Sequence, residues 1–127
     1  MSKEIILKKD TMIVSETDAK GILLYANDDF CKIAGFTKDE LIGNPHNIVR
    51  HYDMPKAAFE DLWSTVQSGG IWNGIVKNKT RDGDFYWVNA TAFSSEDSEG
   101  NKRYISVRVK PTPEEIKSAE DLYKTLN

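Results

Sequence analysis

Hydrophobic and polar positions alternate with a period of two in five parts of the chain. Two such runs, 12–17 and 22–26, flank the turn sequence DAKG and predict a hairpin. Three later runs, 71–79, 84–93 and 103–109, predict strands joined by the links TRDG and SSEDSEGN. Hairpins at both ends of the chain indicate an antiparallel sheet.

Apolar positions with helical spacing lie between the two groups of strands. Asn27 is expected to cap a first helix that Gly35 ends, and Thr37 with Glu40 forms the capping box of a second. Pro55 is expected in the first turn of a third helix. That helix carries an apolar stripe made of Phe59, Leu62, Trp63 and Val66.

The tail sequence predicts a final helix. Thr112 is its expected cap, Pro113 its first residue, and Glu115 completes a capping box. A narrow apolar stripe on this helix needs a surface to cover. The order of elements predicts an α+β fold, with a five-stranded antiparallel sheet, short helices on one face and a C-terminal helix. We expect an N-terminal cap segment at 1–11, one domain at 12–110 and a connecting helix at 111–127.

The predicted inner face of the sheet is small in its middle. Alternation turns Trp72, Gly74 and Asn78 inward together, and the next strand turns two alanines to the same side. This leaves room for something flat, although Leu24, Phe30, Ile48 and Leu62 could instead fill a shallow core from the other side. Asn78 favours a ligand, because a buried carboxamide must satisfy two donors and an acceptor.

Composition narrows the class of protein. The chain has 127 residues, 39% hydrophobic and 29% charged, as in one soluble globular domain. A net charge of -3 argues against a nucleic-acid binder. Cys31 is the only cysteine, so no internal disulfide or zinc set forms, and we expect a cytoplasmic location without a signal peptide or membrane span. The sequence contains no nucleophile elbow, Walker loop or metal-ligand set, so no motif in it indicates an enzyme.

The stretch NPHNIVRHYDMPKAAFEDLW gathers unusual groups at 44–63, including both histidines of the chain. Arg50 and His51 are hard to explain as core residues, because charged groups are seldom buried unpaired. Other members have simpler explanations: Trp63 as part of the helix stripe, Asp53 as a helix cap, and His46 as a partner of nearby backbone. The residues alone leave these alternatives open.

Two parts of the chain resemble a known family. TDAKGILLYANDDFCKIAGFTKDELIGNP resembles the opening of a PAS domain. PHNIVRHYDMPKAAFEDLW and WNGIVKNKTRDGDFYWV resemble the FAD-binding PAS domains of aerotaxis transducers. The resemblance implies non-covalent FAD, redox sensing, and signalling to a methyl-accepting chemotaxis transducer or a HAMP-type module, with a homodimer left open. It implies cofactor contacts from Asn27, His46, Arg50, His51, Asp53, Trp63, Trp72 and Asn78.

Roles for these residues follow from the chemistry of FAD. Arg50 is expected on phosphate oxygens, with His51 beside it and Asp53 on a ribose hydroxyl or on Arg50. Trp63 and Trp72 offer stacking faces. Asn78 is expected at the redox-active ring nitrogen, because a carboxamide can either donate or accept a hydrogen bond.

Two other functions stay open from the sequence. A haem-binding PAS gas sensor would use His46 or His51 as an axial ligand. A cofactor-free PAS interaction module would leave Arg50 and the inward Asn78 unexplained. An acid–base pair of His51 and Asp53 lacks a nucleophile, so catalysis is not expected.

Overall fold

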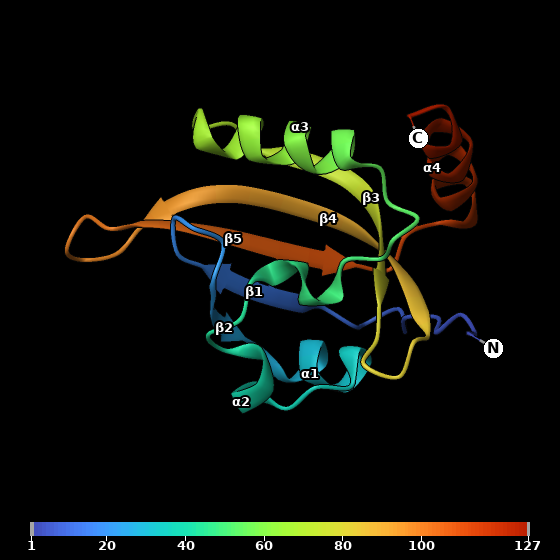
Figure 1. Cartoon of the computed structure of the whole chain (residues 1–127), viewed down its shortest axis with the longest axis horizontal. Coiled ribbons are helices and arrows are strands. Elements are labelled where there is room, and N and C mark those ends of the chain that lie inside the picture. Colours follow the sequence, from blue (N-terminus) through green and yellow to red (C-terminus); the bar gives the residue numbers. More distant parts are fainter. Residues whose placement is uncertain (1, 127) are drawn as a thin grey trace.

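A computed structural model describes residues 2–126, and all structural statements refer to that part of the chain. Residues 1 and 127, the outermost ones of the predicted cap segment and tail helix, lie outside it. Five antiparallel strands form one sheet in the order β2-β1-β5-β4-β3 (Figure 1). The strands are β1 (Ile13–Thr17), β2 (Leu23–Ala26), β3 (Trp72–Lys79), β4 (Phe85–Glu96) and β5 (Lys102–Val109). The expected α+β fold is confirmed.

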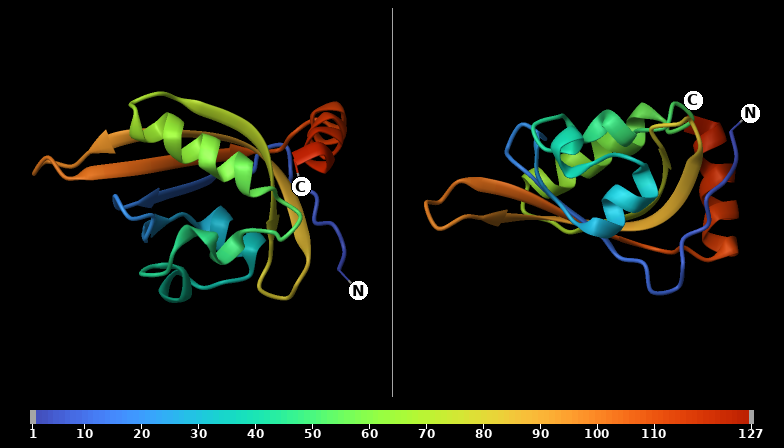
Figure 2. Two further views of the ribbon diagram at one scale, coloured as in Figure 1. Left: turned by 45° about the horizontal axis from the view of Figure 1, so that its top comes forward. Right: turned by 90° about the horizontal axis from the view of Figure 1, so that it is seen from below.

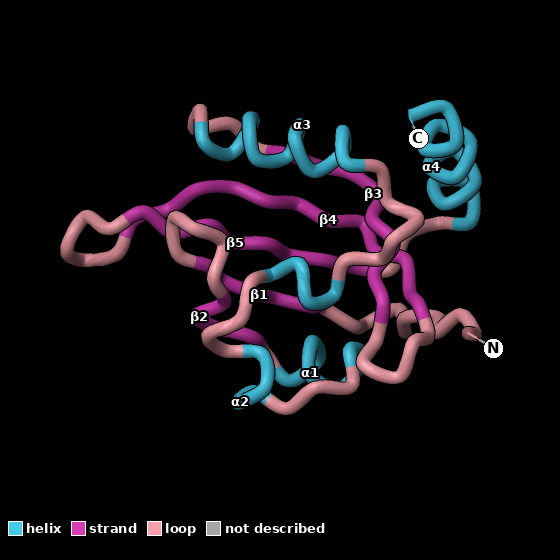
Figure 3. Tube along the Cα trace, viewed as in Figure 1, coloured by secondary structure: helices cyan, strands magenta, loops and turns pink. Residues whose placement is uncertain are grey.

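The helices between the hairpins gather on one face of the curved sheet (Figure 2). They are α1 (Asp28–Ala34), α2 (Lys38–Leu41), the 3-10 turn η1 (His46–Val49) and α3 (Lys56–Gln67). The last helix, α4 (Pro113–Leu126), stands apart from them beside β3. Figure 3 shows the loop that leads from η1 to α3 passing close to β3. The backbones of Arg50 and Asn78 form an antiparallel bridge there.

Local capping signals predicted most helix ends correctly. The Asn27 side chain accepts a hydrogen bond from the Phe30 N–H, and Gly35 ends α1 with φ of 80°. The capping boxes of α2 and α4 are both present. The predicted start of α3 was wrong by one residue. Pro55 precedes the first helical residue and provides no side-chain cap.

Two predictions about the sheet were wrong, each for a local reason. Leu24 is 40% exposed, whereas Leu23 is fully buried, because the β1–β2 register shifts after Glu16 and turns the neighbouring leucine inward. Strand β4 continues to Glu96, beyond its predicted end at Phe93. Its polar last residues pair with the start of β5, so the link shortens to 97–101.

The two ends of the chain cover strand edges. Strand β5 pairs with β4 only as far as Asn89, and the N-terminal segment adds a parallel bridge from Glu4 to Phe85 beyond that point. Trp87 of β4 is only 6% exposed. On the opposite edge, the Tyr123 hydroxyl of α4 donates a hydrogen bond to the Ile75 carbonyl of β3. Each end of the described chain therefore contacts an edge that the sheet leaves free.

Trp72 fills the space over Gly74 on the inner face of β3. A Cβ atom at Gly74 would lie 2.4 Å from the Trp72 ring, closer than van der Waals contact allows. The ring cannot move freely, because its Nε1–H donates to Asp61 of α3 at 2.8 Å. Glycine at this position is therefore required by the packing of the tryptophan.

We expect Gly74→Ala to lower the free energy of unfolding by about 1–3 kcal/mol, as overpacking does in other cores. Urea denaturation would measure the change. Trp72→Phe removes the ring atoms that clash, so Gly74→Ala should cost less in that background. Equal costs in the two backgrounds would contradict the proposed clash.

Candidate functional site

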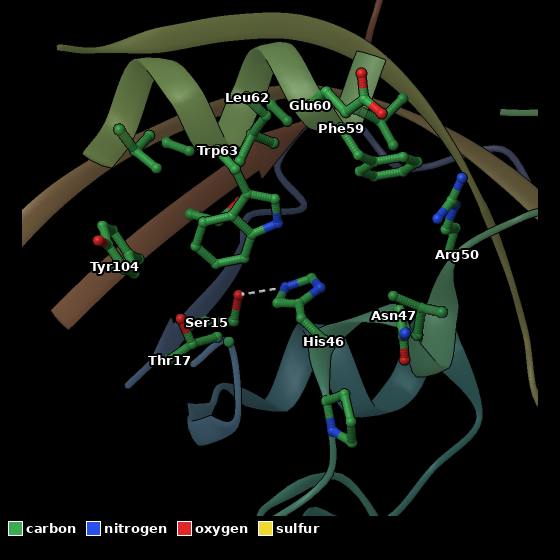
Figure 4. A pocket seen from close by; sticks show the side chains of 18 of the residues that line it. Ser15, Thr17, His46, Asn47, Arg50, Phe59, Glu60, Leu62, Trp63 and Tyr104 are labelled. Atoms are coloured by element: carbon green, nitrogen blue, oxygen red, sulfur yellow. Dashed lines mark hydrogen bonds between the residues drawn. The ribbon is translucent and has the colours of Figure 1, made fainter. Parts of the chain in front are cut away.

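A cavity of about 880 Å³ lies between α3 and the inner face of the sheet. Figure 4 shows His46, Arg50, Phe59 and Trp63 pointing into this space from η1 and α3. Other lining residues come from the strands: Ser15, Thr17, Val76, Asn78, Ala90, Ala92, Tyr104, Ser106 and Arg108. Binding sites for drug-sized molecules and cofactors generally have about 300–1,000 Å³, so the cavity has the size of a ligand site.

Small side chains on β4 create the space. Ala90 and Ala92 face the cavity and are 4% and 6% exposed, and Val76 of β3 lines the same wall. The predicted small inner face is therefore present. Trp72 does not border the cavity, because its ring is folded over Gly74 and tied to α3. The open space lies over the alanines.

A buried arginine forms part of the cavity wall. Arg108 of β5 is 2% exposed, and its Nη2 donates to the Ser15 Oγ at 2.6 Å. Its guanidinium carbon lies 4.6 Å from the centre of the Phe30 ring. None of the ion pairs within residues 2–126 includes Arg108. Burial lowers the pKa of Arg108 to about 10. The group remains a cation near neutral pH.

The hydrogen bonds around Arg108 fix the state of His46. The His46 Nε2 lies 3.2 Å from Arg108 Nη1 and 3.0 Å from Ser15 Oγ. Arginine can only donate, so Nε2 accepts and the ring proton of neutral His46 sits on Nδ1. Burial, and then the charge of Arg108, lower the His46 pKa to about 3. The simpler explanation, that His46 only bonds nearby backbone, is wrong, because its ring contacts the side chains of Ser15 and Arg108.

Two buried polar atoms have no hydrogen-bond partner within residues 2–126. Tyr86 is fully buried, and its hydroxyl makes no hydrogen bond of normal geometry within residues 2–126, although the Asn78 side chain acts on it. Burial raises the pKa of Tyr86 to about 12, while Arg108 and Asn78 act in the opposite direction. The Arg108 Nε is buried and unpaired as well. Such orphaned donors are rare in folded proteins and need an explanation.

Aromatic and cationic groups of η1 and α3 line the opposite wall. The Arg50 guanidinium lies 4.4 Å from the centre of the Phe59 ring. Trp63 packs edge-on against Tyr104 at 5.2 Å between ring centres, and it also contacts the hydrophobic core. Trp63 therefore belongs both to the core stripe and to the cavity wall.

Four of the predicted site residues do not line the cavity: Asn27, His51, Asp53 and Trp72. The Asn27 amide donates to Met12 O and its carbonyl accepts from Val14 N, which ties α1 to β1. His51 Nδ1 accepts from the Asp53 N–H, and Asp53 pairs with Lys77 of β3 at 2.7 Å. Burial, and then Lys77, lower the His51 pKa. His51 and Asp53 thereby anchor the loop that carries Arg50.

The sequence interpretation did not include Ser15 and Arg108, which line the cavity, or the buried hydroxyl of Tyr86. A signal for Arg108 was available. Alternation along 103–109 places Arg108 on the same face as Tyr104, which is an unusual position for a charged residue.

Fold and sequence comparisons define the class of this protein. The chain belongs to the PAS fold family, whose model matches residues 23–108. The dark structure of the blue-light photoreceptor Aureochrome1 LOV aligns with a TM-score of 0.70 at 20% identity, covering 90% of this chain and 80% of that one. At this identity the structural likeness shows the fold alone.

Among proteins of known role, the aerotaxis receptor of Escherichia coli K12 is 48% identical over 121 residues, 95% of this chain. The biofilm dispersion protein BdlA of Pseudomonas aeruginosa is 32% identical over 67% of the chain. The nitrogen fixation regulatory protein of Klebsiella oxytoca is 26% identical over 66%. The matches cover 24%, 21% and 17% of those proteins, so the chain spans about a quarter of their length or less.

Two features are absent from residues 2–126. No helix there is long and apolar enough to cross a membrane. No group of three or more histidine, cysteine, aspartate or glutamate side chains in the same range could hold a metal ion.

The neutral state of His46 predicts a pH-dependent stability of the chain without ligand. Between its ordinary pKa of 6.5 and the folded value of about 3, the unfolded state binds more protons. The free energy of unfolding therefore rises with pH in this window, by at most about 1.4 kcal/mol per pH unit. This contribution is complete above pH 6.5 and is lost as the pH falls toward 3.

We expect His46→Gln to flatten the pH dependence, measured by urea denaturation at a series of pH values. His51→Gln is the comparison, because the pKa of His51 is also lowered. This variant should remove only the contribution of His51 to the pH dependence of the free energy of unfolding. An unchanged slope in His46→Gln would show that the folded protein does not keep this ring neutral.

Proposed function

We propose that the cavity binds FAD without a covalent bond, and that the domain senses redox state through it. The observation that carries the proposal is the cavity of about 880 Å³ whose wall includes the buried Arg108, with an Nε that has no hydrogen-bond partner. The buried Tyr86 hydroxyl is a second such donor. A ligand with acceptor atoms on a flat ring would satisfy such donors, whereas a closed apolar core would leave them unpaired.

The residues present fit the parts of FAD. Ala90 and Ala92 leave room for a flat ring next to the sheet, and Trp63 offers an aromatic face from α3. Asn78 supplies an amide that can donate or accept. Arg50 supplies a guanidinium suited to phosphate oxygens. His51 and Asp53 would act on the cofactor through the position of Arg50, because they lie outside the cavity.

A bound flavin supplies reversible electron transfer, coupled to a proton at its ring nitrogen N5. In the proposed mechanism, the Asn78 carboxamide accepts or donates at this position by rotating. Its backbone is bridged to Arg50, and three residues earlier the Ile75 carbonyl accepts from Tyr123 of α4. Strand β3 therefore joins the cavity to α4, and a shift in its hydrogen bonds would bias the position of that helix.

The comparisons support a sensory role. A relative of 48% identity is an aerotaxis receptor, and another relative is a nitrogen fixation regulatory protein. We propose 12–110 as the sensor domain, 1–11 as a cap and 111–127 as the connection to a partner. That partner would be a methyl-accepting chemotaxis transducer or a HAMP-type module, and the assembly could be a homodimer.

A direct test of the cofactor is the visible absorption spectrum of the purified protein, followed by acid release and chromatography. We expect twin flavin bands and released FAD. A Soret band would instead favour a haem sensor with His46 as a candidate ligand. A colourless protein that takes up no added FAD would favour an interaction module without a cofactor.

Filling the cavity should abolish binding. Ala90→Leu places a larger side chain in the space over β4, so FAD affinity should fall by at least tenfold. Thr91→Leu is the matched control, because its side chain points to the other face of the same strand and should leave affinity unchanged. Fluorescence titration measures both, with circular dichroism as the check on folding. Equal affinities would place the cofactor elsewhere.

Asn78→Asp should keep much of the binding but shift the redox potential, because a carboxylate lacks the donor of the amide. A spectroelectrochemical titration measures the midpoint. Intact binding with an unchanged potential would show that Asn78 does not sense the ring nitrogen.

A further inference from the structure

A second hollow lies between α3, β3 and α4, and we call it the α3–α4 groove. Its volume is about 640 Å³, and none of its lining residues borders the large cavity. Small side chains shape it, since Ala57 and Ala58 of α3 and Ala119 of α4 belong to the lining. Figure 1 shows α4 standing beyond the first turn of α3, so the groove opens between two helices.

Exposed apolar side chains gather at this groove. Leu122 and Leu126 of α4 line it and are 55% and 46% exposed. Ile71, which precedes the lining residue Trp72, is 72% exposed. Single exposed apolar residues are common on protein surfaces, but several at one concave place mark an interaction site. The groove therefore offers an apolar surface that a partner could bury.

The charged residues of the groove are all acidic. Asp61, Glu114 and Glu115 line it, and no described lining residue is basic. None of these three carboxylates takes part in an ion pair within residues 2–126. Asp61 accepts a hydrogen bond from the Trp72 indole, which is neutral. Glu115 accepts from the neutral amide of Asn89. The groove thus carries a negative potential that favours positively charged partners.

The same charges decide between candidate occupants. Helix α4 carries four acidic and two basic side chains, so α4 of a second copy would bring further negative charge to the groove. An added strand is also disfavoured, because the Tyr123 hydroxyl already occupies the Ile75 carbonyl on the free edge of β3. A helix with one apolar face, flanked by lysine or arginine, matches both the exposed leucines and the carboxylates.

We propose that the α3–α4 groove is a docking site for a basic amphipathic helix of a partner protein. The inference goes beyond the proposed function, because it requires no cofactor in the large cavity. Apolar side chains of the partner helix cover Leu122 and Leu126, and its cations lie over Asp61 and Glu114. Because α4 is one wall of the groove, the partner contacts the helix that Tyr123 attaches to β3.

The probe is a synthetic helix of about 18 residues, with leucine on one face and lysine on the other. Fluorescence anisotropy of the labelled peptide, titrated with the full chain, measures its affinity. We expect binding that weakens as salt is added, whereas the same peptide with glutamate in place of lysine should bind at least about tenfold more weakly. Leu122→Lys should weaken binding of the lysine peptide by about tenfold or more, because it places a cation in the groove.

The matched control is Ile6→Lys, which changes the net charge equally at an exposed apolar residue outside the groove. It should leave the affinity unchanged, and circular dichroism checks the folding of both variants. Absence of binding, equal affinity for the two peptides, or equal effects of the two substitutions would overturn the inference. Sedimentation of the unaltered chain as a dimer that Leu122→Lys dissociates would overturn it too, because a second copy would then occupy the groove.

Discussion

A sheet that carries alanines on the inner face of one of its interior strands leaves space between that face and the helices that cover it. Ala90 and Ala92 occupy the middle of β4, where larger apolar side chains would reach the helices. The helix α3 is nevertheless held across this gap by Trp72, whose indole is bonded to Asp61. The rest of the site depends on this arrangement, because the spacing between α3 and the sheet is fixed while the volume between them stays free.

Polar groups around the gap are ordered by one another. Arg108 donates to Ser15 and toward His46, and this leaves the histidine as a neutral acceptor. The two strands and the 3-10 turn that carry these residues are therefore linked through side chains as well as through the sheet. Low local polarity strengthens such bonds, and it equally raises the cost of each donor left without a partner.

Features that depend on neighbouring residues were predicted well from the sequence. The Asn27 cap, the left-handed Gly35 and the Thr37 capping box involve contacts within a few positions, so residue type and spacing determine them. Alternation also placed Asn78 on the inner face. Of the residues expected at the cofactor, four line one cavity: His46, Arg50, Trp63 and Asn78.

The incorrect predictions concern features that are determined by contacts between distant parts of the chain. The Leu23 side chain turns inward because of a register shift between strands, and no local pattern shows that shift. Trp72 was expected beside a ligand, but its position follows from a bond to Asp61 on another element. Alternation along 103–109 does place Arg108 on the inner face, but its contacts with Ser15 and His46 join distant parts of the chain and no local pattern shows them.

Strand β3 lies at the edge of the sheet, where unpaired backbone groups can recruit a strand from another molecule. In this protein the Ile75 carbonyl is occupied by Tyr123, and the Lys77 N–H contacts the Met54 sulfur at 3.3 Å. The hydrogen bond between Tyr123 and Ile75 thus both attaches α4 to the sheet and protects the strand edge against pairing with another molecule. Any movement that frees this helix for a partner also uncovers part of a strand edge, so a partner that replaces the lost hydrogen bond gains an advantage over one that binds the helix alone.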